Sequence, residues 1–427
     1  MVSWLTWDVN LKVRLLGETL FHVCYWMFFP FMALHFSEAF GKETAGFLLM
    51  LPPLLGVYAS LIGGQMADRL GRRPTMLLGA GLQAVMLGLF TLSNSPWIDY
   101  IAFIGLGVGG SFYWPASSAM VADLTPEEDR RHVFATFYTA MNVGVVFGPV
   151  LGSFFYIYYR TPLLIVCTAV TLLYTLAIFF IIKESLPGEV KNQAAQSRST
   201  FGLKEQWRSY SVIFSDKVFA LYIISGILIA IIMMQLDLYM AVYIKEYVPV
   251  QPLFSWGDFS FMIGGTKLFG WMVGLNGLLV VLFTLVVTNW TARWNDRRAF
   301  IISSIIFGLG MAMMGLTTNV WLLFGCIAVL TLGELIRTPV AQSFVSKYAP
   351  EDQRGQYMGA TTLQFSIGRF FAPLLITASQ WMPPLGVFGI ILLCGLISAY
   401  LYVIMFRKLP ASFETGETHG KGTTASM

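Results

Sequence analysis

Long apolar stretches separated by short polar connections run along nearly the whole chain of 427 residues. A helix that crosses a lipid bilayer needs about 20 mostly apolar residues in a row. This length predicts twelve transmembrane helices, and the chain is therefore expected to be an all-α membrane protein. The predicted helices cover residues 14–37, 44–66, 75–94, 97–121, 132–157, 162–182, 218–244, 266–290, 299–317, 320–343, 356–378 and 384–406.

A polar stretch rich in Gln, Ser, Lys and Arg separates the sixth predicted helix from the seventh. It is the longest polar stretch between two predicted helices, and it divides the chain into halves of similar size. The predicted organisation is an N-terminal six-helix bundle at residues 1–182, a linker loop at 183–215, a C-terminal six-helix bundle at 216–406 and a tail at 407–427.

The two halves share a pattern of residues. The segment TPEEDR at 125–130 matches APEDQR at 349–354, and Pro149 in the fifth predicted helix matches Pro373 in the eleventh. These matches have one constant offset of 224 residues across two predicted helices and a loop. The halves are therefore expected to have the same fold, as in transporters built from parallel repeats with a site between them.

Composition excludes a soluble globular protein. Hydrophobic residues make up 56% of the chain and charged residues only 12%, whereas soluble domains carry about 25% charged residues. A soluble fold of this size could not bury so much apolar surface, so membrane lipid is the expected surrounding. The net charge of +4 gives no reason to expect nucleic acid as a partner. The four cysteines show no disulfide or metal-binding spacing, and no metal or other cofactor is expected.

Lys and Arg residues predict the orientation, because cytoplasmic loops of membrane proteins carry an excess of them. If the N-terminus lies inside, only Lys42, Arg160, Lys245 and Lys267 of the 27 Lys and Arg residues face outward. A polar segment without a cleavage site precedes the first apolar run, so no signal peptide is expected. The expected location is the cell (cytoplasmic) membrane, with both termini and the linker loop in the cytoplasm.

A charged motif joins the second and third predicted helices. It reads Gly64-Gln-Met-Ala-Asp68-Arg69-Leu-Gly71-Arg72-Arg73, and it resembles the loop signature G-x-x-x-D-R-x-G-R-R of the major facilitator family. The resemblance implies a conformational latch, in which Asp68 binds a cation or a helix N-terminus in one transport state and releases it in the other. The alternative is a set of arginines that only follows the positive-inside bias, but that bias does not require Asp68.

The fifth predicted helix carries a second motif, formed by Gly144, Gly148, Pro149 and Gly152. It is similar to the antiporter motif of proton-coupled exporters in the major facilitator family. Small residues four positions apart let helices approach closely, and Pro149 bends the helix. The alternative is an ordinary tight helix crossing. The family often has an Arg on the fourth helix that serves proton transfer, whereas residues 104–110 contain none here.

Two acidic residues lie inside predicted helices, Asp237 in the seventh and Glu334 in the tenth. A carboxylate in a bilayer is costly, so such residues usually face the protein interior and serve a function. Removal from water disfavours the charged form of a carboxyl group, so each acid is a candidate to exchange a proton for a cationic substrate. The alternatives are a polar cap near the outer surface for Asp237 and a structural ion pair with Arg337 for Glu334.

The surroundings of both acids resemble the lactococcal lipophilic multidrug/proton antiporter, a major facilitator drug/proton antiporter with twelve spans. The matching segments are Met234-Gln235-Leu236-Asp237 and Thr331-Leu332-Gly333-Glu334. That relative has a further acid on its fifth span, at the place where this chain has Phe137. Arg337, close to Glu334, is a second departure from its pattern.

Other residues inside predicted helices are candidates for a substrate cavity or a proton relay. Glu18 and His22 lie one helical turn apart and form either a relay or a structural pair. Arg369 either pairs with an acid across the cavity or steadies an anionic group. Aromatic side chains suit flat hydrophobic compounds, although many must face lipid. The candidate cavity residues are Tyr25, Trp26, Tyr113, Trp114, Tyr138, Tyr239, Arg337 and Arg369.

No motif for chemistry other than transport is present. The chain has no phosphate-binding P-loop, serine elbow or metal-ligand cluster, so we do not expect an enzyme, and there are no candidate catalytic residues. The expected function is proton-coupled export of small lipophilic, cationic compounds by a monomer, in other words multidrug efflux by alternating access. The alternatives are export of an endogenous lipid or metabolite, including an anionic one, and a sensor or scaffold that does not transport.

Overall fold

The computed structural model describes residues 7–186, 216–350 and 354–409 of the chain. Most of the predicted linker loop, from residue 187, and most of the predicted tail, from residue 410, lie outside the described residues. The described chain is almost entirely helical, in agreement with the prediction from the apolar stretches.

In the N-terminal half, residues 7–186 form helices joined by loops, without strands. Their bounds are α1 (Val9–Phe28), the 3-10 helix η2 (Phe29–Phe31), α2 (Met32–Phe40), α3 (Lys42–Arg69), α4 (Arg72–Leu92), α5 (Pro96–Leu124), α6 (Glu127–Tyr158) and α7 (Arg160–Phe180).

The C-terminal half combines helices with one short hairpin. Its elements are α10 (Lys217–Met234), α11 (Tyr239–Tyr247), β1 (Gln251–Trp256), β2 (Phe259–Ile263), α12 (Gly265–Thr291), α13 (Asp296–Met314), α14 (Val320–Tyr348), α15 (Arg354–Phe371), α16 (Leu374–Ala378) and α17 (Pro384–Lys408).

Ten segments of the described chain are long and apolar enough to cross a membrane. Each of them overlaps one predicted transmembrane helix. The remaining two predictions coincide with α5 and with the pair α15 and α16, which are not among these ten segments. The apolar pattern alone therefore locates the helices to within a few residues at most ends.

Three predicted transmembrane helices are interrupted in the structure. The first is broken at η2, which contains Pro30; the seventh has a turn at residues 235–238; and the eleventh is broken before Leu374, next to Pro373. Proline lacks an N–H group and cannot continue the hydrogen-bond pattern of a helix. A hydrogen bond connects the breaks in the seventh and eleventh helices. The side-chain amide of Gln235 donates to the carbonyl oxygen of Ala372 at 3.0 Å. Such contacts satisfy polar groups that would otherwise be exposed within a membrane.

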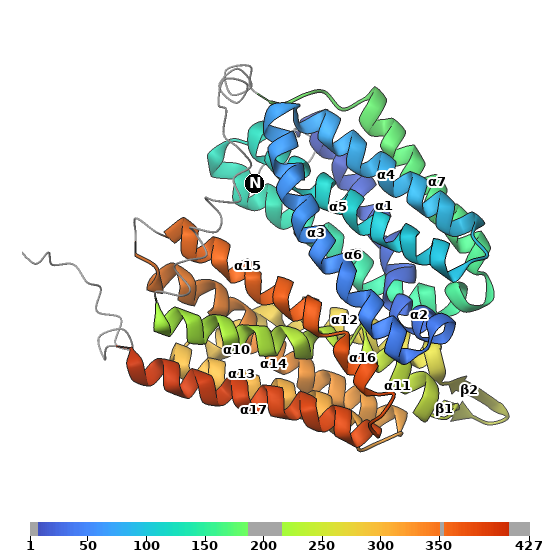
Figure 1. Ribbon diagram of the computed structural model, residues 1–427, viewed down its shortest axis with the longest axis vertical. Coiled ribbons are helices and arrows are strands. Elements are labelled where there is room, and N and C mark those ends of the chain that lie inside the picture. The colour runs from blue at the N-terminus through green and yellow to red at the C-terminus, as the bar shows by residue number, and fades with distance from the viewer. Residues whose placement is uncertain (1–6, 187–215, 351–353, 410–427) are drawn as a thin grey trace, which may run out of the picture.

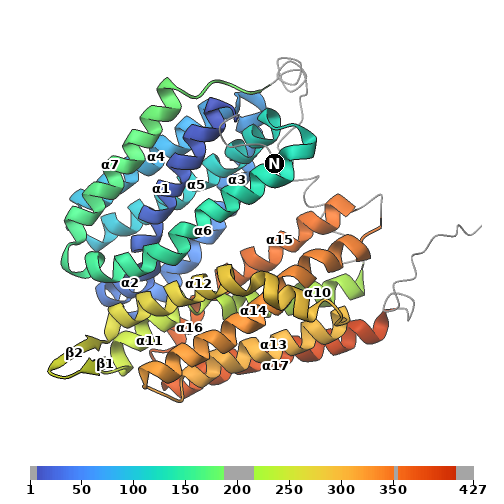
Figure 2. The ribbon, with the colours of Figure 1, turned by 180° about the vertical axis from the view of Figure 1, so that it is seen from behind.

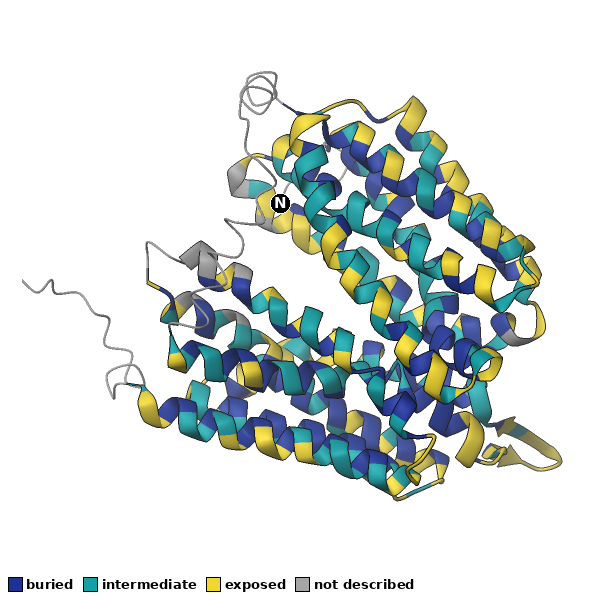
Figure 3. Cartoon of the chain, viewed as in Figure 1, coloured by how far each residue is buried: buried dark blue, intermediate teal, exposed yellow. Residues whose placement is uncertain are grey.

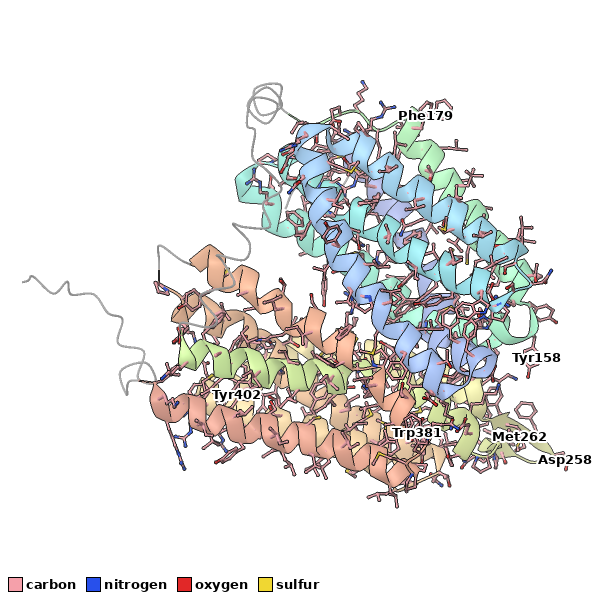
Figure 4. All side chains as sticks on the ribbon, in the orientation of Figure 1. Tyr158, Phe179, Asp258, Met262, Trp381 and Tyr402 are labelled. Atoms are coloured by element: carbon pink, nitrogen blue, oxygen red, sulfur yellow. The ribbon has the colours of Figure 1, made fainter. Side chains whose placement is uncertain are left out.

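An antiparallel hairpin of β1 and β2 lies between α11 and α12. The apolar pattern predicted only a connection between the helices at 218–244 and 266–290, without strands. Gly257 has a φ of +57° in the turn, a conformation that glycine adopts at low cost. Phe254 and Phe261 stack across the strands with ring centroids 5.4 Å apart. Figure 4 shows Asp258 and Met262 on this hairpin, at the edge of the molecule.

The two bundles meet at one end of the molecule. Figures 1 and 2 show that their ribbons converge at the end that carries α2, α11, α16 and the hairpin, here called the hairpin end, and diverge toward the opposite end. That opposite end carries the charged motif between α3 and α4 and is called the latch end. In Figure 3, buried residues concentrate on the helix faces that pack within each bundle.

Contacts between the halves lie toward the hairpin end. Gly270 of α12 packs so closely on α6 that a Cβ atom there would lie 2.4 Å from the carbonyl oxygen of Pro149. Gly46 of α3 packs in the same way on Pro373 and Thr377. The hydroxyl of Thr377 also donates to the backbone carbonyl of Glu43 at 3.2 Å. Small residues thus bring α6 against α12 and α3 against α16.

Two ion pairs connect the halves at the same end. Lys42 at the start of α3 binds Glu246 of α11 at 2.6 Å, and Lys245 of α11 binds Glu38 of α2. The four side chains are partly exposed, and solvent therefore weakens each pair. Each half contributes one cation and one anion to this arrangement.

Candidate functional site

Asp237 lies in the turn that interrupts the seventh predicted helix. The backbone N–H of Asp237 and that of Leu238 both donate to the carbonyl oxygen of Met234, at 3.2 and 3.1 Å. The residue is half-buried, and it interacts electrostatically with Arg369 and Glu334. A broken helix near the middle of a membrane is where many transporters bind substrates and coupling ions.

Glu334 lies on α14 and is fixed by a neutral partner. The side-chain amide of Asn276 on α12 donates to the carboxylate of Glu334 at 3.2 Å and to the hydroxyl of Thr331 at 2.9 Å. One amide thus bridges both side chains, and no ion pair of Glu334 occurs among the described residues. From the sequence, Asn276 was a candidate for a hydrogen bond between helices, but Glu334 could not be identified as its partner.

Arg337 does not pair with Glu334, which corrects one alternative from the sequence. Its guanidinium donates to the hydroxyl of Tyr402 on α17 at 2.6 Å and lies over the rings of Phe300 and Tyr402. Arg337 is only 7% exposed, and Figure 4 shows Tyr402 on α17 within the C-terminal bundle. The i,i+3 spacing allowed a pair with Glu334, but α14 directs Arg337 to α17. It therefore belongs to the core of this bundle and not to a cavity between the halves.

Arg369 on α15 is exposed. It interacts electrostatically with Asp237 of its own half and with Tyr25 on α1 of the other half. Tyr25 also interacts with Asp237. These three side chains, together with Glu334, define the central site, which receives residues from both halves.

Tyr25 of the central site belongs to a group of aromatic side chains on and around α1. Tyr25 stacks on Phe29 with ring centroids 4.7 Å apart, and Trp26 packs edge-on to Phe29 at 5.7 Å. Trp114 of α5 lies edge-on to His22 at 5.4 Å, and Tyr138 of α6 is exposed.

Two aromatic candidates for the cavity lie in the bundle cores instead. Tyr239 is only 2% exposed and packs on Phe388 of α17 with ring centroids 5.4 Å apart. Tyr113 is 5% exposed, and its hydroxyl donates to Glu18. On a helix that is apolar on all faces, the sequence does not show which way a single aromatic side chain points. The structure was therefore needed to show that Tyr239 and Tyr113 lie in the bundle cores.

At the latch end, Asp68 and Arg72 form an ion pair at 2.6 Å within the N-terminal half. Arg72 also binds Asp123 at the end of α5, at 3.1 Å. Gly71 has a φ of +120° between α3 and α4, a region that favours glycine. Gly64 has open space around the position of a Cβ atom. The charged motif therefore forms a cluster on one half, with Asp68 exposed on it.

Glu184 completes this cluster and was missed by the sequence analysis. Its carboxylate accepts hydrogen bonds from the backbone N–H groups of Arg72 and Arg73, at 2.9 and 3.2 Å, at the start of α4. A carboxylate at a helix N-terminus satisfies free N–H groups and interacts favourably with the helix dipole. One sequence feature could have indicated its place in the cluster. Glu184 and Asp123 each follow a predicted helix that ends at the latch end, at residues 182 and 121.

The glycines of the fifth predicted helix, α6, contact α1. A Cβ atom on Gly144 would lie 2.7 Å from the carbonyl carbon of His22, and one on Gly148 would lie 2.4 Å from the Cβ atom of Trp26. Gly152 packs in the same way on Met27. The motif therefore joins two helices of one half, while Pro149 meets Gly270 of the other half.

A polar cluster inside the N-terminal bundle surrounds Glu18. Its Oε1 atom accepts hydrogen bonds from Arg14, at 2.8 Å from Nη2, from Tyr113 at 2.6 Å and from Ser117 at 2.8 Å. Arg14 is 1% exposed, and its guanidinium also lies 5.1 Å from the ring centroid of Phe137. Sequence analysis expected Glu18 to face His22 and assigned Arg14 to a helix end. The side-chain partner of Glu18 is Arg14, one helical turn toward the N-terminus.

The family and the relatives that resemble this chain are transporters. The sequence model of the Major Facilitator Superfamily matches residues 15–266 and 248–425. The Na(+), Li(+), K(+)/H(+) antiporter of Planococcus maritimus is 39% identical over 409 residues, which cover 94% of this chain and 96% of that protein. The multidrug resistance protein MdtH of Proteus mirabilis is 24% identical, over 87% of this chain and 86% of that protein.

Solved structures share the fold. A crystal structure of a POT family transporter in complex with 5-aminolevulinic acid has a TM-score of 0.75 and 18% identity, and the match covers 96% of both chains. At this identity the similarity concerns the fold alone.

Proposed function

Because the chain belongs to the Major Facilitator Superfamily, we propose that it is a membrane antiporter that exchanges protons for cations at the central site. The observation that carries this proposal is the position of Asp237 in the turn of a broken helix, within electrostatic range of Arg369 and Glu334. The chain is a transporter and not an enzyme, as its family and its antiporter relatives indicate.

The charges of the central site support an exchange of single positive charges. Asp237 and Glu334 supply two carboxylates, and Arg369 supplies one cation. Their sum is one negative charge, which one proton or one monovalent cation neutralises. A carboxylate shielded from water resists remaining charged and unpaired, so the site favours occupation by either ion. Competition between them at the same carboxylates is the basis of antiport.

Monovalent metal cations are the first substrate class that we propose. The relative from Planococcus maritimus, named a Na(+), Li(+), K(+)/H(+) antiporter, covers nearly the whole chain. The turn with Asp237 also holds Gln235, whose Oε1 atom is buried and has no hydrogen-bond partner among the described residues. Carboxylate and amide oxygens are the ligands that small hard cations prefer.

Lipophilic organic cations are the second substrate class. Tyr25 of the central site packs against Trp26 and Phe29, and aromatic faces attract cations. The multidrug relative MdtH matches most of the chain at lower identity. Both substrate classes carry a positive charge, so both depend on the same carboxylates.

The test uses purified protein in liposomes that contain a pH-sensitive dye and are loaded with protons. External NaCl, KCl or a fluorescent lipophilic cation should dissipate the proton gradient in the original protein. Asp237→Asn and Glu334→Gln should abolish uphill exchange, because an amide cannot release a proton, whereas downhill substrate movement can persist. Asp258→Asn removes an exposed acid on the hairpin and serves as the matched control.

The outcomes separate the alternatives. Dissipation by metal salts alone supports the first substrate class, and dissipation by the organic cation alone supports the second. If both single variants build the same substrate gradient as the original protein, the antiport proposal fails and the acids are structural. If no cation dissipates the gradient, the proposal also fails, and a metabolite exporter or a non-transporting protein becomes the better interpretation.

A further inference from the structure

A pocket inside the N-terminal bundle is separate from the central site. It lies among α1, α4, α5 and α7 and is lined in part by polar side chains. The lining includes Glu18, His22, Gln83, Thr171 and Trp114. None of the acids assigned to the exchange at the central site belongs to this pocket.

Glu18 presents one unused oxygen in this pocket. Its hydrogen bonds with Arg14, Tyr113 and Ser117 all involve Oε1, and no hydrogen bond of Oε2 occurs among the described residues. Glu18 is only 2% exposed. Oε2 can therefore accept a hydrogen bond from a proton-donating group in the pocket.

His22 presents a second unused acceptor. Its Nδ1 atom donates to the backbone carbonyl oxygen of Glu18 at 2.9 Å, because a carbonyl oxygen can only accept. This contact fixes the tautomer of the neutral ring and leaves Nε2 as the acceptor. Within the described chain no hydrogen bond occupies Nε2. The pocket thus combines a carboxylate oxygen and an imidazole nitrogen, both able to bind a proton.

The charges around His22 come from few groups. Arg14 and Glu18 lie on its own helix and neutralise each other as an ion pair at 2.8 Å. The elements packed against His22 add the titratable hydroxyls of Tyr113 on α5 and Tyr174 on α7, the neutral Gln83 on α4, and the backbone of Gly144 on α6. A proton on His22 is therefore opposed by Arg14 and favoured by Glu18.

His22 also lies at a contact that links the pocket to the other half. Gly144 of α6 packs directly on the backbone of His22, and further along α6 Pro149 packs on Gly270 of α12. α6 therefore contacts both the backbone of His22 and a helix of the other half.

We propose that His22 and Glu18 form a second proton-binding site in the N-terminal half, so that one proton per transport cycle is carried there in addition to the exchange at the central site. The proton binds Nε2 of His22 to give an imidazolium, with Glu18 as its counter-charge and Nδ1 still bound to the backbone. No bond other than this N–H bond forms or breaks. The transport part of this inference rests on the proposed function, whereas proton binding at His22 does not.

Proton binding is tested by fluorescence, since a protonated imidazole quenches a neighbouring indole and Trp114 lies 5.4 Å from His22. The signal is the difference in emission between the original protein and Trp114→Phe, titrated between about pH 5 and pH 8, where histidines change charge. We expect this difference to fall as the pH is lowered. In a His22→Gln background it should not change with pH, whereas His132→Gln, which alters an exposed histidine, should leave the titration intact. A flat difference signal in the original protein would overturn the proposal, even if His22→Gln failed to fold.

The contribution to transport is tested in liposomes by finding the pH gradient at which a fixed cation gradient drives no net flux. His22→Gln should lower the number of protons exchanged per cation by one, and His132→Gln should leave it unchanged. An unchanged proton number in His22→Gln would contradict a role in the cycle. If Asp237→Asn transports normally while the Trp114 signal titrates, the proposed function fails and this proton site stands. If Asp237→Asn is inactive and the Trp114 signal is flat, the proposed function stands and the proton site at His22 fails.

Discussion

Arg337 and Arg369 belong to the same half of the chain, yet their surroundings differ completely. Arg337 is buried against two stacked aromatic rings and binds Tyr402, whereas Arg369 is exposed and interacts with Asp237. The first contributes to packing within a bundle, and the second adds charge to the central site. Only Arg369 is therefore expected to influence ion exchange directly.

Substitution of these two arginines should separate the roles. Arg337→Met should leave the pH dependence of exchange essentially unchanged, because Glu334 takes its hydrogen bond from Asn276. Arg369→Met removes the positive charge from the central site and should change the apparent affinity for cations by about tenfold, which corresponds to ~1.4 kcal/mol. The measurement is the initial exchange rate in liposomes as a function of pH and cation concentration. An altered pH dependence in Arg337→Met would restore the idea that Arg337 pairs with Glu334.

The sequence identified single residues better than it identified their partners. Asp237 and Glu334 were recognised as acids within apolar helices, because an unfavourable residue in such a helix is conspicuous. Their neighbours could not be derived in the same way, since a hydrogen bond such as that of Asn276 joins helices more than 50 residues apart along the chain. Arg14 was missed as the partner of Glu18 for another reason: a residue one turn away in either direction, Arg14 or His22, could face Glu18, and the actual hydrogen bond is with Arg14.

At the scale of elements, the glycines of α6 determine how closely α1 can approach. Gly148→Ala should destabilise the protein, because the new Cβ atom would lie 2.4 Å from the Cβ atom of Trp26 and 2.9 Å from its carbonyl carbon. Overpacking of this kind costs roughly 1–3 kcal/mol. Gly81→Ala on α4 is the matched control, because nothing lies within 4 Å of its Cβ position. Thermal unfolding of both purified variants should show a lower midpoint for Gly148→Ala only. Equal midpoints would indicate that α1 and α6 separate at no cost.

The latch provides a second prediction at this scale. Asp68→Asn removes the charge that binds Arg72 at 2.6 Å and keeps the shape, so folding and substrate binding should remain largely intact. Turnover should fall by about tenfold or more, equivalent to at least ~1.4 kcal/mol, because one transport state loses its charge contact. Glu43→Gln changes an exposed acid at the opposite end of α3 and serves as the control. Normal turnover of Asp68→Asn would remove the latch from the mechanism.

The interruptions in three helices mark the limit of hydropathy as a guide to elements. The apolar stretch around Gln235 continues through the turn, so composition alone predicts one continuous helix there. Pro30 and Pro373 were visible in the sequence, but proline in a membrane helix causes either a bend or a break, and neighbouring helices decide which. The hairpin was missed because its strands are short and lie between two strong helix signals.

For the molecule as a whole, the ion pairs at the hairpin end should hold that end closed. Lys42→Glu places a second acid opposite Glu246, the partner of Lys42. The two acids repel each other, so the variant should favour separation of the halves. Adding Glu246→Lys should restore closure. The partly exposed pair contributes about 0.2–1 kcal/mol, so the populations should shift by up to about fivefold. Spin labels on the exposed positions Asn94 and Leu316, at the hairpin end, report the distance between the halves. Failure of the double variant to recover the original distances would contradict this role.

The orientation in the membrane makes a further prediction for the whole molecule. In a protein without its four natural cysteines, Asp258→Cys on the hairpin should react with a membrane-impermeant thiol reagent in intact cells. Lys183→Cys, exposed at the latch end, should react only after the cells are opened. The physical reason is the excess of Lys and Arg at the latch end, which retains that end in the cytoplasm. The opposite labelling pattern would reverse the proposed orientation of both termini.

The two ion pairs at the hairpin end also bear on the response to membrane voltage. Glu38 and Lys42 cancel each other on one half, and Lys245 and Glu246 cancel each other on the other half. When the halves separate, these four side chains therefore move no net charge through the electric field. Moving a single uncompensated charge across 100 mV would involve ~2.3 kcal/mol, enough to make opening strongly dependent on potential. Any electrical current or voltage sensitivity of this transporter should consequently arise from its bound ions and its central charges, and not from the opening and closing of the hairpin end.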